Sequence, residues 1–535
     1  MTTTPAHPGI PAPPKGEFYF PTPAIPNRVI KMEDDIMERV CRLLFEGKLV
    51  EKIDELPAEL VPEENAEERG KMRSRIIACL GLKVEEDDGQ PLSELAKKAM
   101  ERKASDLALP VLTFMDNLCN RCAKDQYIVT DQCQNCTGRP CAETCGKKAI
   151  DHTTGKARID PAKCARCGLC AKACPFNAIV RKVTPCVAHC PVGAIETLPD
   201  DRKVFHWDKC ISCGQCVRNC PFGAVEPRTQ VTDVVRGMID PNRKMVAMLA
   251  PAVAGHFPHP ITIAAIKEAC VKAGFDVCIE VAVGADVTTL TEAAEFDERM
   301  ENFEKKVPGA LPFMATSCCP AWVNCVHQHI PEIESAISHT GSPMHYIGDI
   351  CKERYPGCET VFVGPCIAKL TEGLRKPQID YVITFQDLNA ILRARDVTFK
   401  PNMPDDPADP DVGCAESRMY PVIAGVASAV ASVRIKNPEK YPHEVTPLVC
   451  DGLSPESFKK IKTFGKTAPP GNIFEVMCCR GGCCHGPGSL LNAQMSSTRC
   501  KLTANKSKHH PESATPVVLK PTYLIDGKFV AADQL

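Results

Sequence analysis

Cysteine is the residue type through which this chain could most plainly do chemistry. The chain has 535 residues, and 33 of them are cysteine, several times ordinary usage. Sixteen of the 33 lie between Cys119 and Cys220, many of them in Cys-x2-Cys spacings. Disulfide frameworks belong to chains under about 100 residues that cannot build a core. In a chain of this length, the spacing therefore favours metal ligands over disulfides.

Two segments share the spacing Cys-x2-Cys-x2-Cys-x3-Cys-Pro, one beginning at Cys164 and the other at Cys210. This is the bacterial ferredoxin spacing, in which three cysteines hold one 4Fe–4S cluster and the fourth ligates the neighbouring cluster. Zinc is the alternative, but zinc ribbons rarely show three evenly spaced cysteines followed by Cys-Pro. The spacing predicts iron–sulfur clusters in both segments.

Weaker cysteine runs precede both segments, so that the sixteen cysteines divide into four ligand sets with none left over. The predicted sets are Cys133, Cys136, Cys141 and Cys174; Cys164, Cys167, Cys170 and Cys145; Cys210, Cys213, Cys216 and Cys190; and Cys119, Cys122, Cys186 and Cys220. A small zinc or redox pair remains the alternative for Cys119 and Cys122. Four accessory 4Fe–4S clusters without substrate chemistry of their own would form an electron wire.

Three cysteine motifs further along the chain suggest what such a wire would feed. They are TSCCPAW over 316–322, GPCIAK over 364–369 and EVMCCRGGCCHGPG over 475–488. The first two follow strand-like runs and open helix-like ones, where free backbone N–H groups and the helix dipole favour an anionic ligand. The glycines of the third let the backbone approach such a ligand closely.

These motifs resemble the three signatures of the iron-only (FeFe) hydrogenases, over roughly residues 115–490. The resemblance implies an enzyme that interconverts H2 with protons and electrons at an H-cluster. That cofactor joins a 4Fe–4S cluster to a two-iron subsite with CO, cyanide and a dithiolate bridge. It further implies that Cys319, Cys366, Cys479 and Cys483 ligate the 4Fe–4S part, with Cys483 bridging to the two irons.

The same resemblance assigns roles to residues around the cofactor. Lys369 would hydrogen-bond a cyanide, Met477 would line the two-iron subsite, and Pro251 would belong to the same pocket. A proton route would begin at the Cys318 thiol and continue through Glu295, Ser338 and Glu292, with Arg299 near the exit. Segment 284–299 predicts a capped amphipathic helix with both glutamates on one face. Two carboxylates buried together tend to keep one proton, which suits a relay.

Five positions depart from the family pattern. Gly364 stands where the second motif usually has Met, and Met344, where Gln is common, is a candidate to fill that space. Ala252 replaces a frequent Ser and would lose a hydrogen bond to cyanide. Cys478 and Cys484 stand at positions that are usually not thiols, and they could be inert, coordinate iron or protect it under oxidation. Most other unassigned cysteines are expected to be buried thiols.

The expected fold class is a multidomain α+β and α/β chain with a helical N-terminal lead-in. The predicted parts are a Pro-rich extended segment over 1–30, a helical region over 31–118, ferredoxin-like 4Fe–4S domains over 119–225, an FeFe-hydrogenase-like α/β catalytic domain over 244–491 and a C-terminal segment over 492–535. Helical spacing of Ile36, Val40, Leu43 and Leu44 supports the second part.

Finer predictions concern single elements. The acidic stretch 57–70 is predicted to be a loop. Strands are predicted at 246–249, 277–283, 312–316 and 361–364, and helices at 322–329 and 367–374. Short strands with a turn at Asp526-Gly527 are predicted within 517–530.

Composition argues against several classes of function. The formal charge is only −2, from 64 Lys+Arg and 66 Asp+Glu, which argues against a protein built to bind nucleic acid or an anionic membrane. No apolar run approaches the roughly 20 residues that cross a bilayer, and no secretory signal is visible, so a cytoplasmic location is expected. No Gly-x-Gly-x-x-Gly follows a strand, so no NAD or flavin site is expected on this chain. The expected partners are a ferredoxin or similar redox carrier and H-cluster maturation proteins.

Three other functions stay open at this point. A non-catalytic iron–sulfur assembly protein of the same fold would need neither the proton route nor Lys369, and both are present. An H2-sensing hydrogenase would have the same motifs with slow turnover. A subunit of an NAD-linked complex would need its flavin or NAD site on another chain. The direction of catalysis depends on cluster potentials, which the sequence does not give.

Overall fold

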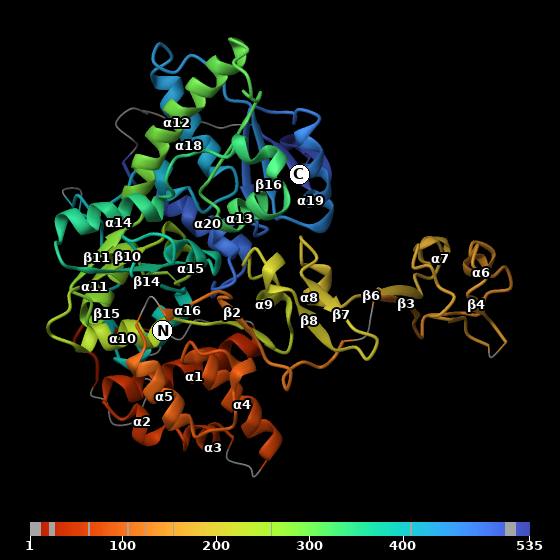
Figure 1. Cartoon of the computed structure of the whole chain (residues 1–535), viewed down its shortest axis with the longest axis horizontal. Coiled ribbons are helices and arrows are strands. Elements are labelled where there is room, and N and C mark those ends of the chain that lie inside the picture. The colour runs from red at the N-terminus through yellow and green to blue at the C-terminus, as the bar shows by residue number, and fades with distance from the viewer. Residues whose placement is uncertain are drawn as a thin grey trace.

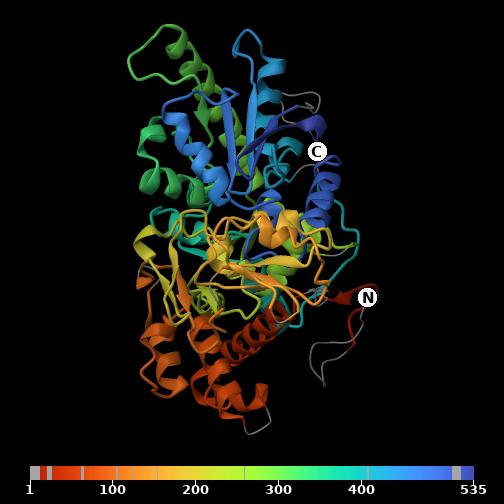
Figure 2. The same cartoon turned by 90° about the vertical axis from the view of Figure 1, so that its right-hand side faces the viewer.

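The computed structural model describes residues 12–20, 27–61, 65–103, 106–122, 125–153, 155–257, 259–406, 409–508 and 520–534. Figure 1 shows a helical region at one end, two sheet-containing regions above it and a small lobe that projects to the side. The turned view in Figure 2 shows the same succession from N-terminal helices to the C-terminal sheet. Much of the Pro-rich segment over 1–30 lies outside the described residues.

The N-terminal region is helical, as its periodicity predicts. Its helices are α1 Arg28–Phe45, α2 Leu49–Lys52, α3 Leu56–Leu60, α4 Ala66–Cys79 and α5 Leu92–Glu101. The Asn27 side chain accepts the N–H of Val29 and so begins α1, whose apolar face, with Ile36, Val40 and Leu44, is buried. This face packs against α16, Phe385–Ala394, and fixes the lead-in to the body of the molecule.

The predicted loop over 57–70 is wrong for most of its described part. Helix α3 carries Pro57 in its first turn, and α4 begins at Ala66. The Asn65 side chain accepts the N–H of Glu68, and Glu67 and Glu68 lie in the first turn of α4. Acidic residues favour the positive end of a helix, so the same acidity that indicated a loop stabilises a helix start.

Two mostly parallel sheets form the region from residue 244 onward. The first sheet has the order β11-β10-β13-β14, and the second has the order β12-β17-β16-β18-β19. Their strands are β10 Met245–Leu249, β11 Val277–Glu280, β12 Met314–Ala315, β13 Glu359–Val363, β14 Tyr381–Ile383, β16 Pro447–Asp451, β17 Ile473–Met477, β18 Thr522–Ile525 and β19 Lys528–Ala531. Strands β10 and β17 are wholly buried, which explains their continuous apolar sequences.

Helices connect and cover these sheets. They are α10 Val231–Ile239, α11 Ile263–Ala273, α12 Ala282–Glu304, α13 Pro320–His329, α14 Pro343–Arg354, α15 Ala368–Gly373, α17 Ala415–Arg418, α18 Gly425–Lys436, α19 Pro455–Ile461 and α20 Ala493–Ala504. The predicted strand 277–283 is too long, because β11 ends at Glu280 and α12 starts at Ala282. The predicted side-chain cap of α12 is also absent: Val281 is the N-cap, and Asp286 accepts a hydrogen bond from Ser417. The C-terminal hairpin with its Asp526-Gly527 turn is confirmed.

The cysteine-rich part forms two similar modules. The outer module, 125–182, is the projecting lobe, with strands β3 Gln126–Val129, β4 Ile150–Asp151, β5 Arg158–Ile159 and β6 Ile179–Lys182 and helices α6 Pro140–Glu143 and α7 Leu169–Ala173. The inner module, 112–122 with 183–227, has strands β2 Leu112–Phe114, β7 Ile195–Thr197, β8 Lys203–Phe205 and β9 Val225–Pro227 and helices α8 Pro185–Ala188 and α9 Gln215–Asn219. The inner module lies against the rest of the chain, whereas the outer module projects away from it beyond β3 and β6 (Figure 1).

Every helix in the described part of the chain falls short of the length and apolarity that crossing a membrane would require.

Candidate active site

The opening Cys-x2-Cys turns at Cys119, Cys133, Cys164 and Cys210 share one backbone feature. The residue before the second cysteine has a positive φ in each: Arg121 (43°), Asn135 (49°), Arg166 (57°) and Ser212 (58°). Residues other than glycine rarely adopt this conformation. Because this conformation recurs in all four turns, Cys119-x2-Cys122 has the same turn as the three runs predicted to bind iron–sulfur clusters. The sequence alone leaves a zinc or redox pair as the alternative for these two cysteines.

Backbone N–H groups point at the thiols in a repeated pattern. Four cysteines each accept a hydrogen bond at Sγ from the backbone N–H of the alanine four residues later, with N to Sγ distances of 3.1–3.4 Å. The pairs are Ala149 to Cys145, Ala178 to Cys174, Ala194 to Cys190 and Ala224 to Cys220. Cys164 and Cys210 each accept an N–H from two residues ahead, at 3.4 Å. Such donors stabilise thiolate sulfur, the form that binds iron.

The structure brings together members of each predicted ligand set. Burial raises the pKa of Cys141 and Cys170, and nearby thiolates add to the shift: Cys136 and Cys174 for the first, Cys164 and Cys145 for the second. In the inner module, burial raises the pKa of Cys216, with Cys210, Cys213 and Cys190 as charged neighbours. Burial raises the pKa of Cys186 to about 11, with Cys220 and Cys119 beside it. Ligation itself stays a prediction, and Cys167 is exposed on its turn.

The four cysteines of the downstream motifs also converge. Cys319 is the N-cap of α13, and Cys366 lies two residues before α15. Cys479 and Cys483 flank Gly481 and Gly482, whose φ angles are 83° and 72°. Burial raises the pKa of Cys479, and the neighbouring Cys366, Cys319 and Cys483 add to it. The buried thiol of Cys478 donates a hydrogen bond to Cys319 and lowers its pKa to about 6.

The inner module is packed directly on these motifs. Gln215 Nε2 donates to the Cys478 carbonyl at 3.2 Å, and an Arg218 guanidinium nitrogen donates to the Gly486 carbonyl at 2.9 Å. A Cβ added at Gly214 would lie 2.4 Å from Pro487 Cγ. Cys213 and Cys319 act on each other as charged neighbours. The Cys190 set is therefore the accessory set nearest to the downstream cysteines in these contacts.

A buried row of polar side chains leads away from Cys318. Burial raises the pKa of this thiol, and Glu292 is its strongest charged neighbour. Burial, with the charges of Glu295 and Glu475, raises the pKa of Glu292 to about 8, and Glu292 is hydrogen-bonded to Ser338. Ser338 Oγ donates to Glu295 Oε2 at 2.6 Å, and Arg299 Nε donates to Glu295 Oε1 at 2.9 Å.

The order of the two glutamates differs from the one that the resemblance implies. Glu292, which is 1% exposed, is the neighbour of Cys318, whereas Glu295 lies one helical turn further along α12, next to Arg299. The row therefore runs Cys318, Glu292, Ser338, Glu295, Arg299. Helix α12 points its N-terminal half toward the cysteine motifs, and spacing at i, i+3 alone could not show which glutamate lies deeper.

Of the remaining predicted pocket residues, Lys369 and Met477 are buried and Pro251 is half-buried. Lys369 Nζ donates to Glu372 Oε2 at 2.7 Å and to Ser342 Oγ at 3.0 Å, so one of its three N–H donors is left over. Its charged neighbours include Cys366 and Cys318. Met477 packs with Cys318 and Cys483 in one apolar cluster. Pro251 begins the short helix η4, Pro251–Gly255, which contacts η7, Gly482–His485.

The positions that depart from the family pattern have identifiable surroundings. The atoms nearest to a Cβ placed at Gly364 belong to Phe362 and Ala250, and the filling of that space by Met344 stays a prediction. Cys484 is fully buried, with its thiol 3.7 Å from that of Cys500. Ala252 is buried, and its carbonyl faces the Cys500 thiol at 3.8 Å.

Several residues near the row carried no role in the sequence analysis. Tyr420 packs against Cys318, and its hydroxyl lies 2.8 Å from Thr289 Oγ1. Buried Glu475 accepts the N–H groups of Ala424 and Ala427 at the start of α18. Glu475 is the first residue of the third motif, and this position in the sequence is the feature that could have indicated a role for it.

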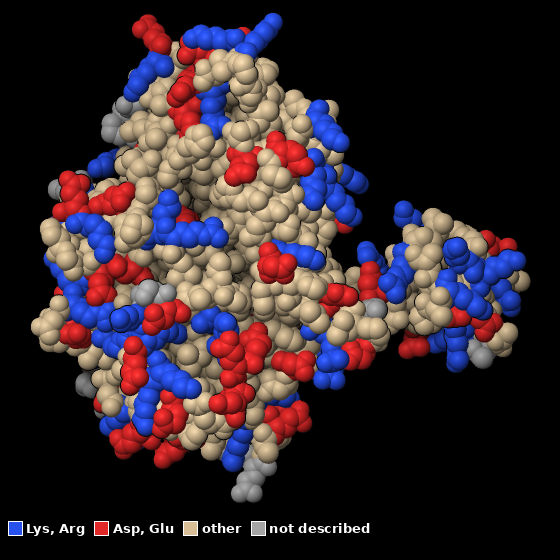
Figure 3. All heavy atoms as spheres, in the orientation of Figure 1, with Lys and Arg blue, Asp and Glu red and all other residues tan. Residues whose placement is uncertain are grey.

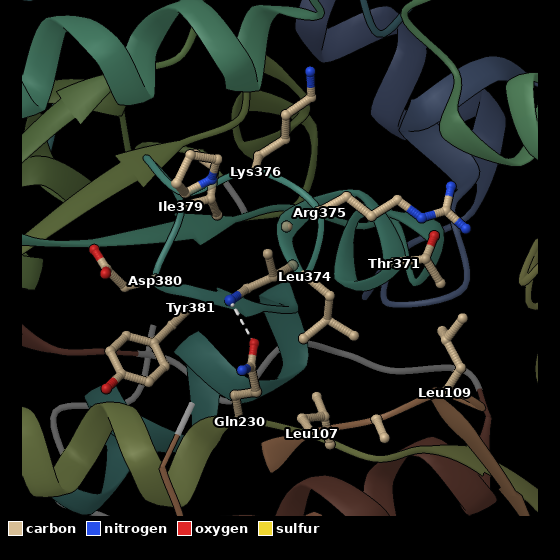
Figure 4. Close-up of a pocket in the computed structure, with 14 residues that line it drawn as sticks. Leu107, Leu109, Gln230, Thr371, Leu374, Arg375, Lys376, Ile379, Asp380 and Tyr381 are labelled. Carbon is tan, nitrogen blue, oxygen red and sulfur yellow. Dashed lines mark hydrogen bonds between the residues drawn. The ribbon is translucent and has the colours of Figure 1, made fainter. Parts of the chain in front are cut away.

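Two hollows lie away from the third cysteine motif. One of 330 Å³ is lined by Ser338, Thr340 and Glu372, among others, and so opens beside the polar row. The other, of 770 Å³, lies between Leu107–Leu109 and the segment that joins α15 to β14 (Figure 4). There Gln230 Oε1 accepts the N–H of Val382 at 2.9 Å. Its lining includes none of the cysteine motifs.

Comparison with known proteins agrees with this geometry. Residues 243–487 match the family model of the iron-only hydrogenase large subunit, C-terminal domain. The 4Fe–4S binding domain model matches 157–180, in the outer module, and 203–226, in the inner module.

The matches to two curated relatives span most of the length of each relative. Iron hydrogenase 1 of Clostridium pasteurianum is 27% identical over 67% of this chain and 70% of that protein. The periplasmic Fe hydrogenase large subunit of Nitratidesulfovibrio vulgaris is 29% identical over 64% of this chain and 89% of that protein. A solved FeFe-hydrogenase from Chlamydomonas reinhardtii is 17% identical, with a TM-score of 0.43, over 53% of this chain and 92% of that chain. Residues 243–487 therefore belong to the iron-only (FeFe) hydrogenase family, and ferredoxin-type 4Fe–4S segments precede this hydrogenase domain.

Proposed function

We propose that this chain interconverts H2 with two protons and two electrons. The observation that carries the proposal is the buried row from Cys318 to Arg299, which starts among the cysteine motifs and ends near the surface. Cys319, Cys366, Cys479 and Cys483 would hold an H-cluster, whose two-iron part supplies the redox chemistry at which H2 is split or formed. The set fits such a group, because one buried and three half-buried cysteines converge there beside backbone N–H donors and the buried ammonium of Lys369.

The protonation states along the row alternate in a way that suits proton transfer. Glu292, with a pKa of about 8, holds a proton at neutral pH. Burial works against the charge of Glu295, but donors from Ser338, His339, Thr340 and Arg299 outweigh it and lower its pKa. A protonated carboxyl, a hydroxyl and a carboxylate in sequence can pass a proton by successive transfers along existing hydrogen bonds.

The inner end of the row faces the thiol of Cys318. Glu292 Oε2 is buried and has no hydrogen-bond partner among the described residues. Leaving such an atom unpaired costs about 1–3 kcal/mol. A proton exchanged between Cys318 and Glu292 would give Glu292 Oε2 a hydrogen-bond partner for part of the time. The unpaired oxygen therefore supports transfer between these two residues as the first step.

The outer end of the row meets solvent. The His339 side chain is 86% exposed, and its Nδ1 lies 3.5 Å from Glu295 Oε1. The hollow of 330 Å³ beside Ser338 gives water a second approach. Arg299 donates to the carbonyls of Ser335 and Ile337 and so holds the exit segment in place.

Electrons would enter through the two ferredoxin-type modules. We propose four accessory 4Fe–4S clusters on the four cysteine sets, with the Cys190 set next to the H-cluster ligands. The donor would be a ferredoxin or similar carrier, and dedicated maturation proteins would insert the two-iron part. A cytoplasmic location stays a prediction, since one relative is named as periplasmic.

Infrared spectroscopy with iron counting tests the proposal. The matured protein should contain about 22 iron atoms per chain and show CO and cyanide stretching bands. About 20 iron atoms without such bands after full maturation would favour a non-catalytic assembly protein and overturn the proposal.

The thiol at the start of the row has its own test. Cys318→Ala should keep the infrared bands while H2 evolution collapses, because the cofactor remains but the thiol that would hand it protons is gone. Cys325→Ala, which removes a fully buried thiol from the following helix, is the matched control. Unchanged turnover in Cys318→Ala would refute its role.

A further inference from the structure

We propose that the outer module is the docking site for an acidic protein that carries single electrons, and that loop 163–176 makes the central contact. The inference rests on the proposed function, because electrons received there must be used elsewhere in the chain. One electron would leave the carrier's reduced cluster and enter a cluster of the outer module, with no bond or proton exchanged.

The internal repeat supplies the first argument. In the inner module, the loop around Cys210–Cys220 is the surface that meets the hydrogenase domain: Gln215 and Arg218 donate to its carbonyls, and Ile211 is buried in its core. The corresponding loop of the outer module has the same spacing but no such cover. Leu169, which corresponds to Gln215, is 47% exposed.

Charge supplies the second argument. Residues 125–182 contain ten Lys and Arg but only five Asp and Glu, whereas the whole chain has a net charge of −2. All ten basic residues are exposed. Among the described residues, only Lys156, Lys163 and Arg181 have an ion-pair partner within the chain. Figure 3 shows Lys and Arg over much of the visible face of the lobe, so the lobe would attract an acidic partner.

The arrangement of the loop supplies the third argument. Lys163, Arg166 and Lys172 alternate with the ligand cysteines of one set, and Cys167 itself is exposed. Leu169 and Phe176, 47% and 45% exposed, lie on the same loop. Apolar contacts among basic residues match a protein surface with an acidic rim. Leu169 and Phe176 also lie on the loop that carries the ligand cysteines, where a partner would come closest to a cluster. A polyanion that binds by charge alone would need neither these apolar contacts nor this closeness to a cluster.

Reduction of the accessory clusters by a purified acidic bacterial ferredoxin tests the proposal directly. The chain is produced without maturation proteins, so that it carries accessory clusters but no two-iron subsite, and stopped-flow absorbance follows their reduction. The second-order rate should fall steeply with added salt. The triple variant Lys163→Glu, Arg166→Glu, Lys172→Glu should react about 10-fold more slowly or worse at low salt.

The controls separate docking from folding and from general charge. The variant Lys31→Glu, Lys466→Glu, Lys501→Glu reverses three exposed charges elsewhere and should stay within about twofold of the original rate. Iron content and reduction by methyl viologen should be unchanged in both triple variants. Leu169→Ser should slow the reaction without changing its salt dependence.

Equal rates in the two triple variants, or a rate independent of salt, would overturn the proposal. Tighter binding of duplex DNA than of ferredoxin at physiological salt would also overturn it, because it would assign the basic lobe to nucleic acid. The assay involves no H2, so its result is independent of whether the matured chain is a hydrogenase.

Discussion

The outer and inner modules use the same cysteine spacing in opposite surroundings. In the inner module, the loop that carries Cys213 lies against the third cysteine motif, and Gly214 leaves room for Pro487. In the outer module, Gly168 occupies the equivalent position, but its neighbour is Tyr127 of the same module. The turns, the positive φ angles and the N–H donors to sulfur are shared.

The shared turn geometry and the surroundings of each loop are therefore set by separate parts of the sequence. The cysteines, the turn residues and the glycines define the shared local structure. The residues between them decide what the loop meets: Ile211, Gln215 and Arg218 bind the hydrogenase domain, whereas Arg166, Leu169 and Lys172 face solvent. One duplicated unit can thus give both an internal and an external contact.

The largest expected effect comes from removing one ligand in each module. Cys213→Ser and Cys167→Ser should each lose about four iron atoms. Cys213→Ser should abolish turnover with any electron donor, because it damages the set that contacts the H-cluster motifs. Cys167→Ser should abolish turnover with ferredoxin but keep most of the turnover with methyl viologen. Identical losses with both donors would show that the modules are not arranged in series.

The next largest effect distinguishes proton transfer from electron transfer. Glu292→Gln should slow H2 evolution by about 100-fold or more, because an amide cannot relay a proton. Reduction of the accessory clusters by ferredoxin should be unaffected. Glu301→Gln, on the exposed face of the same helix α12, is the control and should keep full activity. Normal H2 evolution in Glu292→Gln would remove this residue from the route.

The raised pKa of Glu292 also has a consequence for stability. The pKa moves from its ordinary value of 4.5 to about 8 in the folded chain. Between these values the folded chain keeps a proton that the unfolded chain releases, so the free energy of unfolding falls as pH rises and levels off above about 8. Glu292→Gln should flatten that part of the thermal stability profile and melt at a higher temperature than the original chain at pH 9. A profile unchanged by the substitution would contradict the shift.

A smaller effect should distinguish the two equivalent glycines. Both have positive φ, 71° at Gly214 and 78° at Gly168, so alanine costs about 1–2 kcal/mol of backbone strain at either position. At Gly214 the new Cβ also meets Pro487 and Ile367, which adds about 1–3 kcal/mol. At Gly168 it meets the movable end of Tyr127. Thermal unfolding should therefore show the larger loss for Gly214→Ala, and equal losses would argue against tight packing of the inner module.

The smallest effect concerns the side chains at one equivalent position. Arg218→Ala removes the hydrogen bond to the Gly486 carbonyl and should cost about 1.5–3 kcal/mol of unfolding free energy. Lys172→Ala, at the matching exposed position, should change it by less than about 0.5 kcal/mol. A comparable loss for Lys172→Ala would mean that the outer loop is also packed against the chain.

The sequence predicts the local structures better than their placement. Cysteine spacing indicates the four sets because ligand geometry is local, and apolar runs indicate β10 and β13 because both strands are buried. The acidic residues before and within the first turn of α4 indicate a loop but form a helix start, since acidity favours both a solvent-exposed loop and a helix N-terminus. The order of Glu292 and Glu295 depends on the direction of α12 relative to the motifs. The contact of Phe362 with Gly364 likewise depends on packing that spacing does not encode.

Exposure of the matured, oxidised chain to H2 tests the central claim most directly. The claim is that electrons pass between the H-cluster site and the outer module through the inner one. Electron paramagnetic resonance of freeze-quenched samples should show reduced 4Fe–4S clusters of both modules in the original chain. Consumption of H2 with the outer clusters still oxidised, or no reduction of either module, would contradict it.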